Sequence, residues 1–195
     1  MLDQGERVGF AKEIREAKAS GAMVRIERDA FEIGWLTGYV VATGPKFFAL
    51  ELVTGSARLD GVACIRYSDV TACGPELRAG FMTKALKVRG EARAAQIPVT
   101  LASLPKLLAS AAKAFPIITL HVPDADTGGY ACYIGRVVAL NTASVDFHHI
   151  TPDGAWEKSL AEIPFSEIVR VDFGGDYEDA LFLVAGKPRQ IRSRT

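Results

Sequence analysis

The sequence repeats one pattern at a spacing of about half the chain. The first copy begins at Gly38 and closes at Asp69, and the second begins at Gly135 and closes at Glu167. The opening glycines are 135 − 38 = 97 positions apart and the closing acids 167 − 69 = 98, so one inserted residue reconciles both ends. A tandem duplication predicts two domains, residues 1–97 and residues 98–195, each with a modest core.

Within each half, short runs of alternating apolar and polar residues predict strands separated by turns. The predicted strands are residues 23–28, 35–42, 47–53 and 62–67, then 117–122, 130–140, 144–150, 156–163 and 168–173. Apolar residues at helical spacing predict helices over 6–19, from 73–76 to about 88, over 100–115 with Ser103 as N-cap, and over 177–185. Each half is therefore predicted to run helix, strand meander, helix.

This arrangement resembles the Sm and Sm-like family of small five-stranded barrels, one kind of SH3-like barrel. The resemblance rests on a helix before the strands, on a glycine that opens a long second strand, and on an apolar third strand. These pieces are Gly38-Tyr39-Val40 with Phe48-Ala49-Leu50, and Gly135-Arg136-Val137 with Val145-Asp146-Phe147. It implies a mainly β fold of two tandem Sm-like (SH3-like) small barrels, each preceded and followed by a short helix.

The residues with which RNA-binding members of that family read bases are mostly missing. Those members carry an acidic residue and an asparagine after the second strand, where this chain has Gly44 and Phe48 in one copy and Asn141 and Val145 in the other. Their closing Arg-Gly pair is only half kept, because Arg66 is followed by tyrosine. Since fold and function are separable, the resemblance supports the scaffold and not uridine recognition.

Charge gives a second indication about partners. The chain has 23 basic and 23 acidic side chains, a balance that disfavours a dedicated nucleic-acid binder unless the charges are segregated. Two basic segments stand out, formed by Arg78, Lys84, Lys87, Arg89 and Arg93 and by the tail residues Arg189, Arg192 and Arg194. They are either a solvated helix face with a basic tail or an RNA-binding or other nucleic-acid-binding surface.

No residue pattern predicts an enzyme. Nucleophilic catalysis needs a serine or cysteine beside a base that a third group orients. His148 and His149 are consecutive on a predicted strand and point to opposite faces, and His121 has no partner at a recognisable spacing. Zinc-type cysteine pairs and the HExxH pattern are absent from the sequence. We therefore predict no catalytic residue, no metal site and no cofactor.

Two weaker hypotheses concern a ligand and an interface. The segment from Asp69 to Gly74 resembles the Asp-x-Ser-x-x-Gly motif of PilZ barrels, which bind cyclic dinucleotides with an upstream arginine pair. Arg25 and Arg28 lie upstream here, although at a different spacing. Trp156 follows a turn-forming Pro-Asp-Gly-Ala segment, so we expect it to be the more exposed of the two tryptophans and the better interface candidate, with core packing as the default for both.

Cysteine usage and the N-terminal residues bear on location. Three cysteines without a CxxC spacing indicate reduced thiols, and no secretory signal or stretch of ~20 apolar residues is visible, so we predict a cytoplasmic protein with no membrane partner. The leading hypothesis is a non-enzymatic module that binds a protein partner or associates with itself. Nucleic-acid binding is the alternative, and binding of a small molecule of the cyclic-dinucleotide type is the lesser one.

Overall fold

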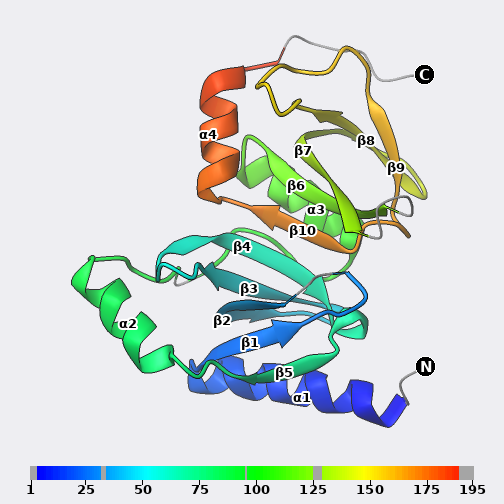
Figure 1. The fold of residues 1–195 in the computed structure, drawn as a ribbon. Coiled ribbons are helices and arrows are strands. Elements are labelled where there is room, and N and C mark those ends of the chain that lie inside the picture. The colour runs from blue at the N-terminus through cyan, green and yellow to red at the C-terminus, as the bar shows by residue number, and fades with distance from the viewer. Residues whose placement is uncertain (1–3, 32–33, 95, 125–128, 189–195) are drawn as a thin grey trace. The chain divides into compact units, whose positions relative to one another are not determined.

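The computed structural model describes residues 4–31, 34–94, 96–124 and 129–188. The chain divides into two compact units, Met1–Ile97 and Pro98–Thr195. The described residues are mainly β, with ten strands and four α-helices (Figure 1). None of the helices in these ranges combines the length and the apolar character needed to cross a membrane.

The first unit is one antiparallel sheet with a helix before it and a helix after it. Its strands lie in the order β5-β1-β2-β3-β4, so the fifth strand lies beside the first. The elements are α1 (Gln4–Ser20), β1 (Met23–Glu27), β2 (Trp35–Thr43), β3 (Phe47–Val53), β4 (Leu59–Arg66), the 3₁₀ turn η1 (Tyr67–Asp69), β5 (Ala72–Pro75) and α2 (Ala79–Val88).

The second unit has the same order of elements without the 3₁₀ turn. Its strands lie in the order β10-β6-β7-β8-β9, which matches the first unit strand for strand. The elements are α3 (Leu104–Ala114), β6 (Ile118–Asp124), β7 (Gly129–Leu140), β8 (Ser144–His149), β9 (Ala161–Pro164), β10 (Arg170–Phe173) and α4 (Asp176–Ala185). Ser103 caps α3 as predicted, because its hydroxyl accepts a hydrogen bond from the backbone of Lys106.

Within the part of the chain that the structure describes, neither sheet closes on itself. In the first unit β5 and β4 are not neighbours, and in the second unit β10 and β9 are not neighbours. The coarse prediction of a mainly β chain with flanking helices is confirmed. Each unit is an open, antiparallel five-stranded sheet in these residues.

The two opening glycines of the repeat perform the same structural task. A Cβ atom on Gly38 would lie 2.2 Å from the carbonyl oxygen of Glu51, and one on Gly135 would lie 2.1 Å from that of His148. Only glycine permits so close an approach of the neighbouring strand. The register then shifts at the same offset in both copies, between Val40 and Ala42 and, 97 positions later, in β7. Such bulges increase the local bend of a sheet.

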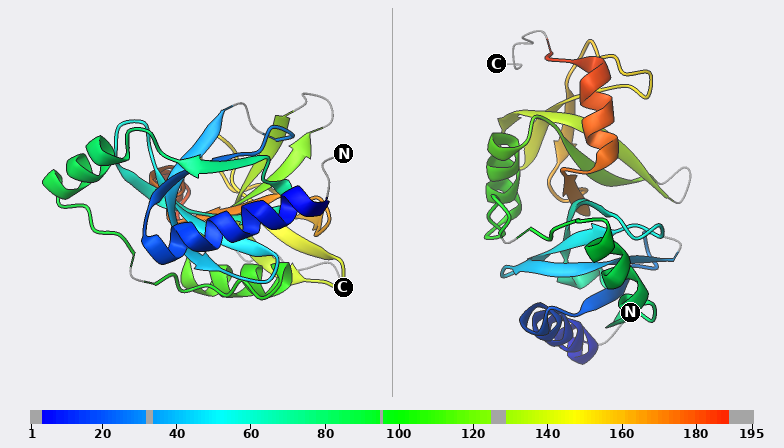
Figure 2. Two further views of the ribbon diagram at one scale, coloured as in Figure 1. Left: turned by 90° about the horizontal axis from the view of Figure 1, so that it is seen from below. Right: turned by 90° about the vertical axis from the view of Figure 1, so that its left-hand side faces the viewer.

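Apolar side chains cover both faces of the first sheet. Ile14 and Ala17 of α1 pack on Val24, Ile26 and the other apolar residues of that face, and α1 lies across the strands (Figure 2). On the opposite face, Met82 and Leu86 of α2 pack with Met23, Tyr39, Val53 and Ala57. Complete burial of one such side chain stabilises the fold by about 1.5–3 kcal/mol.

The second sheet is also covered by two helices. α3 buries Leu104, Leu107, Leu108 and Ala111, and α4 packs through Leu181 against Ile117 and Ile150. The right-hand view of Figure 2 shows α3 and α4 on either side of the strands. In both units, the helix that follows the last strand is attached by few buried side chains.

Two segments differ from the sequence-based prediction. Residues 73–76 were predicted to begin a helix, but Ala72–Pro75 form β5, which pairs with β1, and the helix begins only at Ala79. The predicted strand over 156–163 shortens to β9, because Trp156 makes only an isolated bridge to Ile150. The extent of backbone pairing with a neighbouring strand therefore sets the bounds of both strands, whatever the local sequence prefers.

Candidate interaction surface

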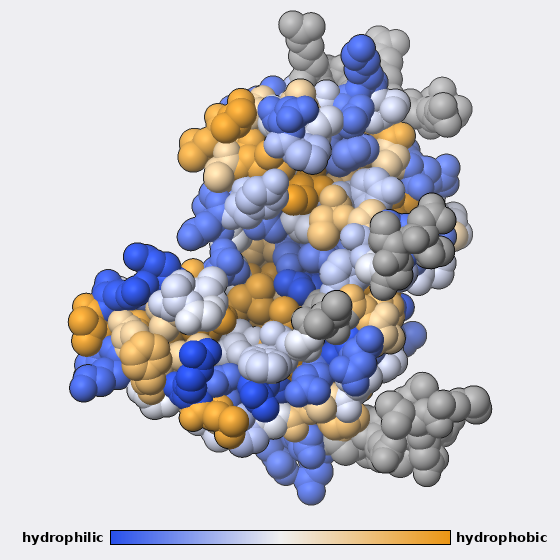
Figure 3. Space-filling view, in the orientation of Figure 1, coloured by the Kyte–Doolittle hydropathy of each residue, from blue (hydrophilic) through white to orange (hydrophobic). Residues whose placement is uncertain are grey.

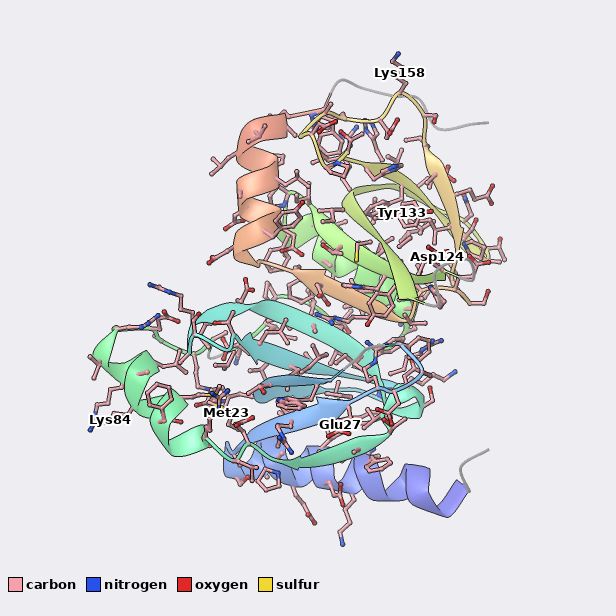
Figure 4. All side chains as sticks on the ribbon, in the orientation of Figure 1. Met23, Glu27, Lys84, Asp124, Tyr133 and Lys158 are labelled. Atoms are coloured by element: carbon pink, nitrogen blue, oxygen red, sulfur yellow. The ribbon has the colours of Figure 1, made fainter. Side chains whose placement is uncertain are left out.

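The exposed face of α2 combines apolar and basic side chains. Phe81, Lys84 and Val88 are spaced i, i+3 and i+7, so they lie on one face, opposite the buried Met82 and Leu86. Phe81 is 64% exposed and Val88 is 79% exposed, unusually high values for large apolar residues. Lys84 projects from α2 away from the sheet (Figure 4), and apolar and hydrophilic residues alternate over α2 in Figure 3.

The corresponding helix of the second unit, α4, combines apolar and acidic side chains. Leu183 is 83% exposed, and Tyr177 and Val184 are also exposed. Asp176 and Asp179 occupy its first turn and are exposed, while Glu178 turns inward and accepts a hydrogen bond from Thr119 at 2.5 Å. Acidic groups at this end are favoured by the helix dipole. The two helices therefore expose similar apolar residues and opposite charges.

Only part of the first basic segment is available for binding. Lys84, Lys87 and Arg89 are exposed on or beside α2. Arg78 lies 3.9 Å from Glu76, and Arg93 stacks on the ring of Tyr39 at 3.8 Å from the ring centre. The second basic segment, Arg189, Arg192 and Arg194, lies outside the described residues.

The tryptophans have the opposite exposure from that expected. Trp156 is half-buried, stacks on His148 with ring centres 4.7 Å apart, and donates a hydrogen bond of 3.0 Å to the carbonyl of Gly186. Trp35 is the exposed one, at 51%, and Arg25 stacks on it at 4.5 Å. The prediction that Trp156 is the more exposed interface residue is therefore wrong, and it packs inside the second unit.

The segment that resembles a PilZ motif is used within the fold. Arg28 is fully buried and lies 3.9 Å from Asp69, which also accepts a 2.8 Å bond from Arg66. Thr71 accepts a hydrogen bond from the backbone of Asp29. Arg28 and Asp69 are therefore buried and contact each other within the first unit.

A pocket of about 280 Å³ lies within the second unit. Its walls come from the end of α3 and from β6 and β7. Arg136 also lines it, and its Nε atom is buried with no hydrogen-bond partner among the described residues.

Equivalent positions on the third strand of each unit hold different polar groups. In the first unit Glu51 is buried and accepts a 2.8 Å hydrogen bond from the backbone of Ala94. Ninety-seven positions later His148 is buried and its Nε2 lies 2.7 Å from the carbonyl oxygen of Glu157. The neighbouring His149 is half-buried, and burial lowers its pKa. Glu51 and His148 therefore each hold a neighbouring loop in place within their own unit.

His121 lies in a polar cluster that the sequence did not indicate. Its Nε2 lies 3.1 Å from Asp172 Oδ2, and its Nδ1 lies 3.5 Å from the sulfur of Cys132. Arg170 holds Asp172 through two bonds, Nε to Oδ1 at 2.7 Å and Nη2 to Oδ2 at 2.5 Å. The ring of Tyr130 meets His121 edge-on with centres 5.4 Å apart. His121 has no partner at a recognisable spacing in the sequence, but the folded chain brings Asp172 and Cys132 to it.

Strand pairing explains this cluster. His121 is directly opposite Cys132 in the β6–β7 pair and opposite Arg170 in the β6–β10 pair. Asp172 follows Arg170 by two residues and so shares its face. Cys132 and Asp172 lie 11 and 51 positions after His121 in the sequence, and strand pairing brings both of them to it. Asp172 therefore belongs to β10 and to the cluster, and the acidic first turn of α4 begins only at Asp176.

The cluster holds His121 in its charged form. Burial disfavours the charge, but the hydrogen bonds to Asp172 and Cys132 and the negative charge of Asp172 outweigh it and raise the pKa of His121 to about 9. For Asp172, burial favours the protonated form, yet the charge of Arg170 and the bond from His121 lower the pKa below its ordinary value. At neutral pH an imidazolium therefore lies between the carboxylate of Asp172 and the sulfur of Cys132.

Comparisons with protein-family models, with curated proteins and with solved structures found no match to this chain.

Proposed function

We propose that this chain is a non-enzymatic module of two Sm-like (SH3-like) units that associates with further copies of itself through α2 and α4. The observation that carries the proposal is the pair of equivalent helices, which expose large apolar side chains and opposite charges. Phe81 and Val88 accompany lysines on α2, and Leu183 accompanies aspartates on α4. Exposed apolar patches with a polar rim are typical of protein interfaces.

Strand order supports the Sm-like part of the proposal. In each unit the fifth strand pairs beside the first, which is the arrangement that a small five-stranded barrel requires. The close approach at Gly38 and Gly135 and the bulges that follow bend each sheet at the same point. Bulges and glycines are the features by which sheets curl toward closure.

An antiparallel alignment of α2 and α4 satisfies both helices together. Lys84 and Lys87 lie in the second half of α2, whereas Asp176 and Asp179 lie in the first half of α4. When the helices run in opposite directions, Lys87 meets Asp176 and Lys84 meets Asp179. The same register brings the region of Gly80 and its neighbour Phe81 against Leu183. The two helix dipoles then also oppose each other favourably.

The size of this contact sets its strength. Each helix has only ten residues, so the interface falls in the small class that gives weak association, with a Kd on the order of 100 µM. Because different surfaces meet, the contact is head-to-tail and produces a ring or an open chain of copies. Surface ion pairs are screened by salt, so association weakens as salt rises.

The same lysines could serve nucleic-acid binding, but the surface suits protein better. Phe81 and Val88 are interleaved with Lys84 on one face, and Arg78 and Arg93 already contact carboxylates or an aromatic ring. A protein surface with apolar and acidic residues matches both kinds of side chain. Nucleic acid would match only the cations and is therefore an outcome of the test.

Sedimentation equilibrium over a range of concentrations at low salt tests the proposal. We expect the mean mass to rise above the monomer mass of 21.0 kDa, and we expect Phe81→Asp and Leu183→Asp each to prevent the rise. Ala109→Asp, on the exposed part of α3, is the matched control and should associate like the wild type. A constant monomer mass would refute self-association. Retention on single-stranded RNA that Lys84→Glu with Lys87→Glu abolishes would favour nucleic acid instead.

A further inference from the structure

The three cysteines have markedly different surroundings. Cys64 is fully buried on β4. Cys73 is half-buried on β5, and burial together with the negative charge of Glu13 raises the pKa of its thiol to about 11. Cys132 is exposed on β7, and the Nδ1 atom of His121 lies 3.5 Å from its sulfur. β7 is marked in Figure 4 by Tyr133, the residue that follows Cys132.

The groups around His121 keep a positive charge beside this sulfur. Asp172 fixes the Nε2 side of the ring, so the Nδ1 proton points toward Cys132. The groups that face His121 are Asp172 and Arg170 from β10 and Cys132 and Tyr130 from β7. Arg170 is committed to both oxygens of Asp172, so the imidazolium is the cation in contact with the sulfur.

The first unit has the same positions without this chemistry. There Glu27 occupies the place of His121, Trp35 the place of Cys132, and Ala72 the place of Arg170, as the matching strand pairs show. The scaffold therefore does not require a histidine, a cysteine or an arginine at these positions. In the described residues no set of three or more His, Cys, Asp or Glu side chains is arranged to hold a metal ion.

From this geometry we infer that Cys132 is a reactive thiol, activated by His121 and positioned for mixed-disulfide formation with small-molecule disulfides. A cation at the sulfur stabilises the thiolate, which is the attacking form. Asp172 and Arg170 are positioning residues that hold the imidazolium in place. This site would make the second unit open to reversible thiol modification, which is a property beyond self-association.

The reaction is a thiol–disulfide exchange. The Cys132 thiolate attacks one sulfur of the disulfide, a new S–S bond forms to Cys132, and the original S–S bond breaks. The second sulfur leaves as a thiolate with the bonding electron pair and takes the Nδ1 proton of His121, which solvent restores. The small disulfide is the oxidant, since one of its sulfur atoms leaves as a reduced thiol.

The test follows reaction of the folded protein with 4,4′-dithiodipyridine at pH 6, by released thione and by intact mass. We expect one fast thiol in the wild type, lost in Cys132→Ser and kept in Cys73→Ser and Cys64→Ser. We expect His121→Gln to slow the reaction about 10-fold or more at pH 6 and to approach the wild-type rate near pH 10, where His121 of the wild type has also lost its charge. Circular dichroism confirms that each variant is folded.

Two results would overturn the inference. One is a fast thiol that persists in Cys132→Ser. The other is a folded His121→Gln protein whose rate follows the wild-type pH profile throughout. If His121→Gln fails to fold, the wild-type profile still decides, because a Cys132 that reacts at pH 6 no faster than a free small thiol contradicts activation.

Discussion

The two units share a backbone plan and differ in the polar side chains placed on it. Gly38 and Gly135 permit the same close approach, and the same bulge follows each. Glu51 of the first unit corresponds to His148 of the second, and the two anchor different loops. Positions that bend or fill the sheet have been kept in both copies. The polar positions have diverged, and they hold the candidates for function.

The last helices show the same divergence at the surface. α2 and α4 both follow the fifth strand and expose apolar side chains, but α2 carries lysines and α4 carries aspartates. If α2 and α4 carried charges of the same sign, the two helices would repel each other. Opposite charges make a head-to-tail contact between copies favourable.

The largest expected effect comes from the shared glycines. Gly38→Ala and Gly135→Ala each place a Cβ within about 2.2 Å of a backbone oxygen, so each should destabilise the protein by about 3 kcal/mol or more. Urea unfolding measures both. The matched control is Gly80→Ala on exposed α2, where a Cβ meets nothing within 4 Å; it should be neutral or stabilise by about 0.5–1 kcal/mol. Tolerance of alanine at one glycine alone would show that the copies bend differently.

The next effect depends on pH and belongs to the second unit. The folded-state pKa of His121, about 9, lies above its ordinary value of 6.5, so the folded protein binds this proton more tightly. The stabilisation is complete below pH 6.5 and is lost as pH rises through 9. We expect a contribution on the order of 3 kcal/mol.

Urea unfolding of the wild type and of His121→Gln at intervals from pH 6 to pH 10 measures this contribution as a difference between the two proteins. The difference should shrink as pH rises. A difference that stays constant over this interval would show that His121 is neutral in the fold.

Glu51 and His148 should give a smaller and local effect. Glu51→Leu removes the acceptor for the Ala94 amide, at a cost of about 1 kcal/mol. Hydrogen exchange at Ala94 should accelerate, with no change around Glu157. His148→Leu should do the reverse, because its partner is the carbonyl of Glu157. Equal changes at both loops in either variant would contradict separate anchoring.

Much of the scaffold could be predicted from the sequence because its signals are local. The spacing of 97 between Gly38 and Gly135 marks corresponding points of the two meanders, and Ser103 marks the start of α3. β5 was missed because Ala72, Gly74 and Pro75 have little strand preference. Its place depends on pairing with β1, which local sequence does not encode.

The polar cluster was missed because its residues meet only after the strands pair. One signal was available: His121 and Cys132 lie at equal distances from the middle of the β6–β7 connection, as expected for opposite residues of a hairpin. Asp172 could not be placed without knowing that β10 lies beside β6. Trp156 was misjudged because the turn before it folds back and brings its ring against His148.

The most direct measurement of the central proposal is a mixing experiment with two charge-reversed proteins. One carries Lys84→Glu and Lys87→Glu, and the other carries Asp176→Lys and Asp179→Lys. Alone, each has like charges on α2 and α4, so sedimentation equilibrium should show monomer mass. Mixed in equal amounts at low salt, they should associate as the wild type does, because each α2 again meets an α4 of opposite charge. Failure of the mixture to associate while the wild type does would contradict pairing of α2 with α4.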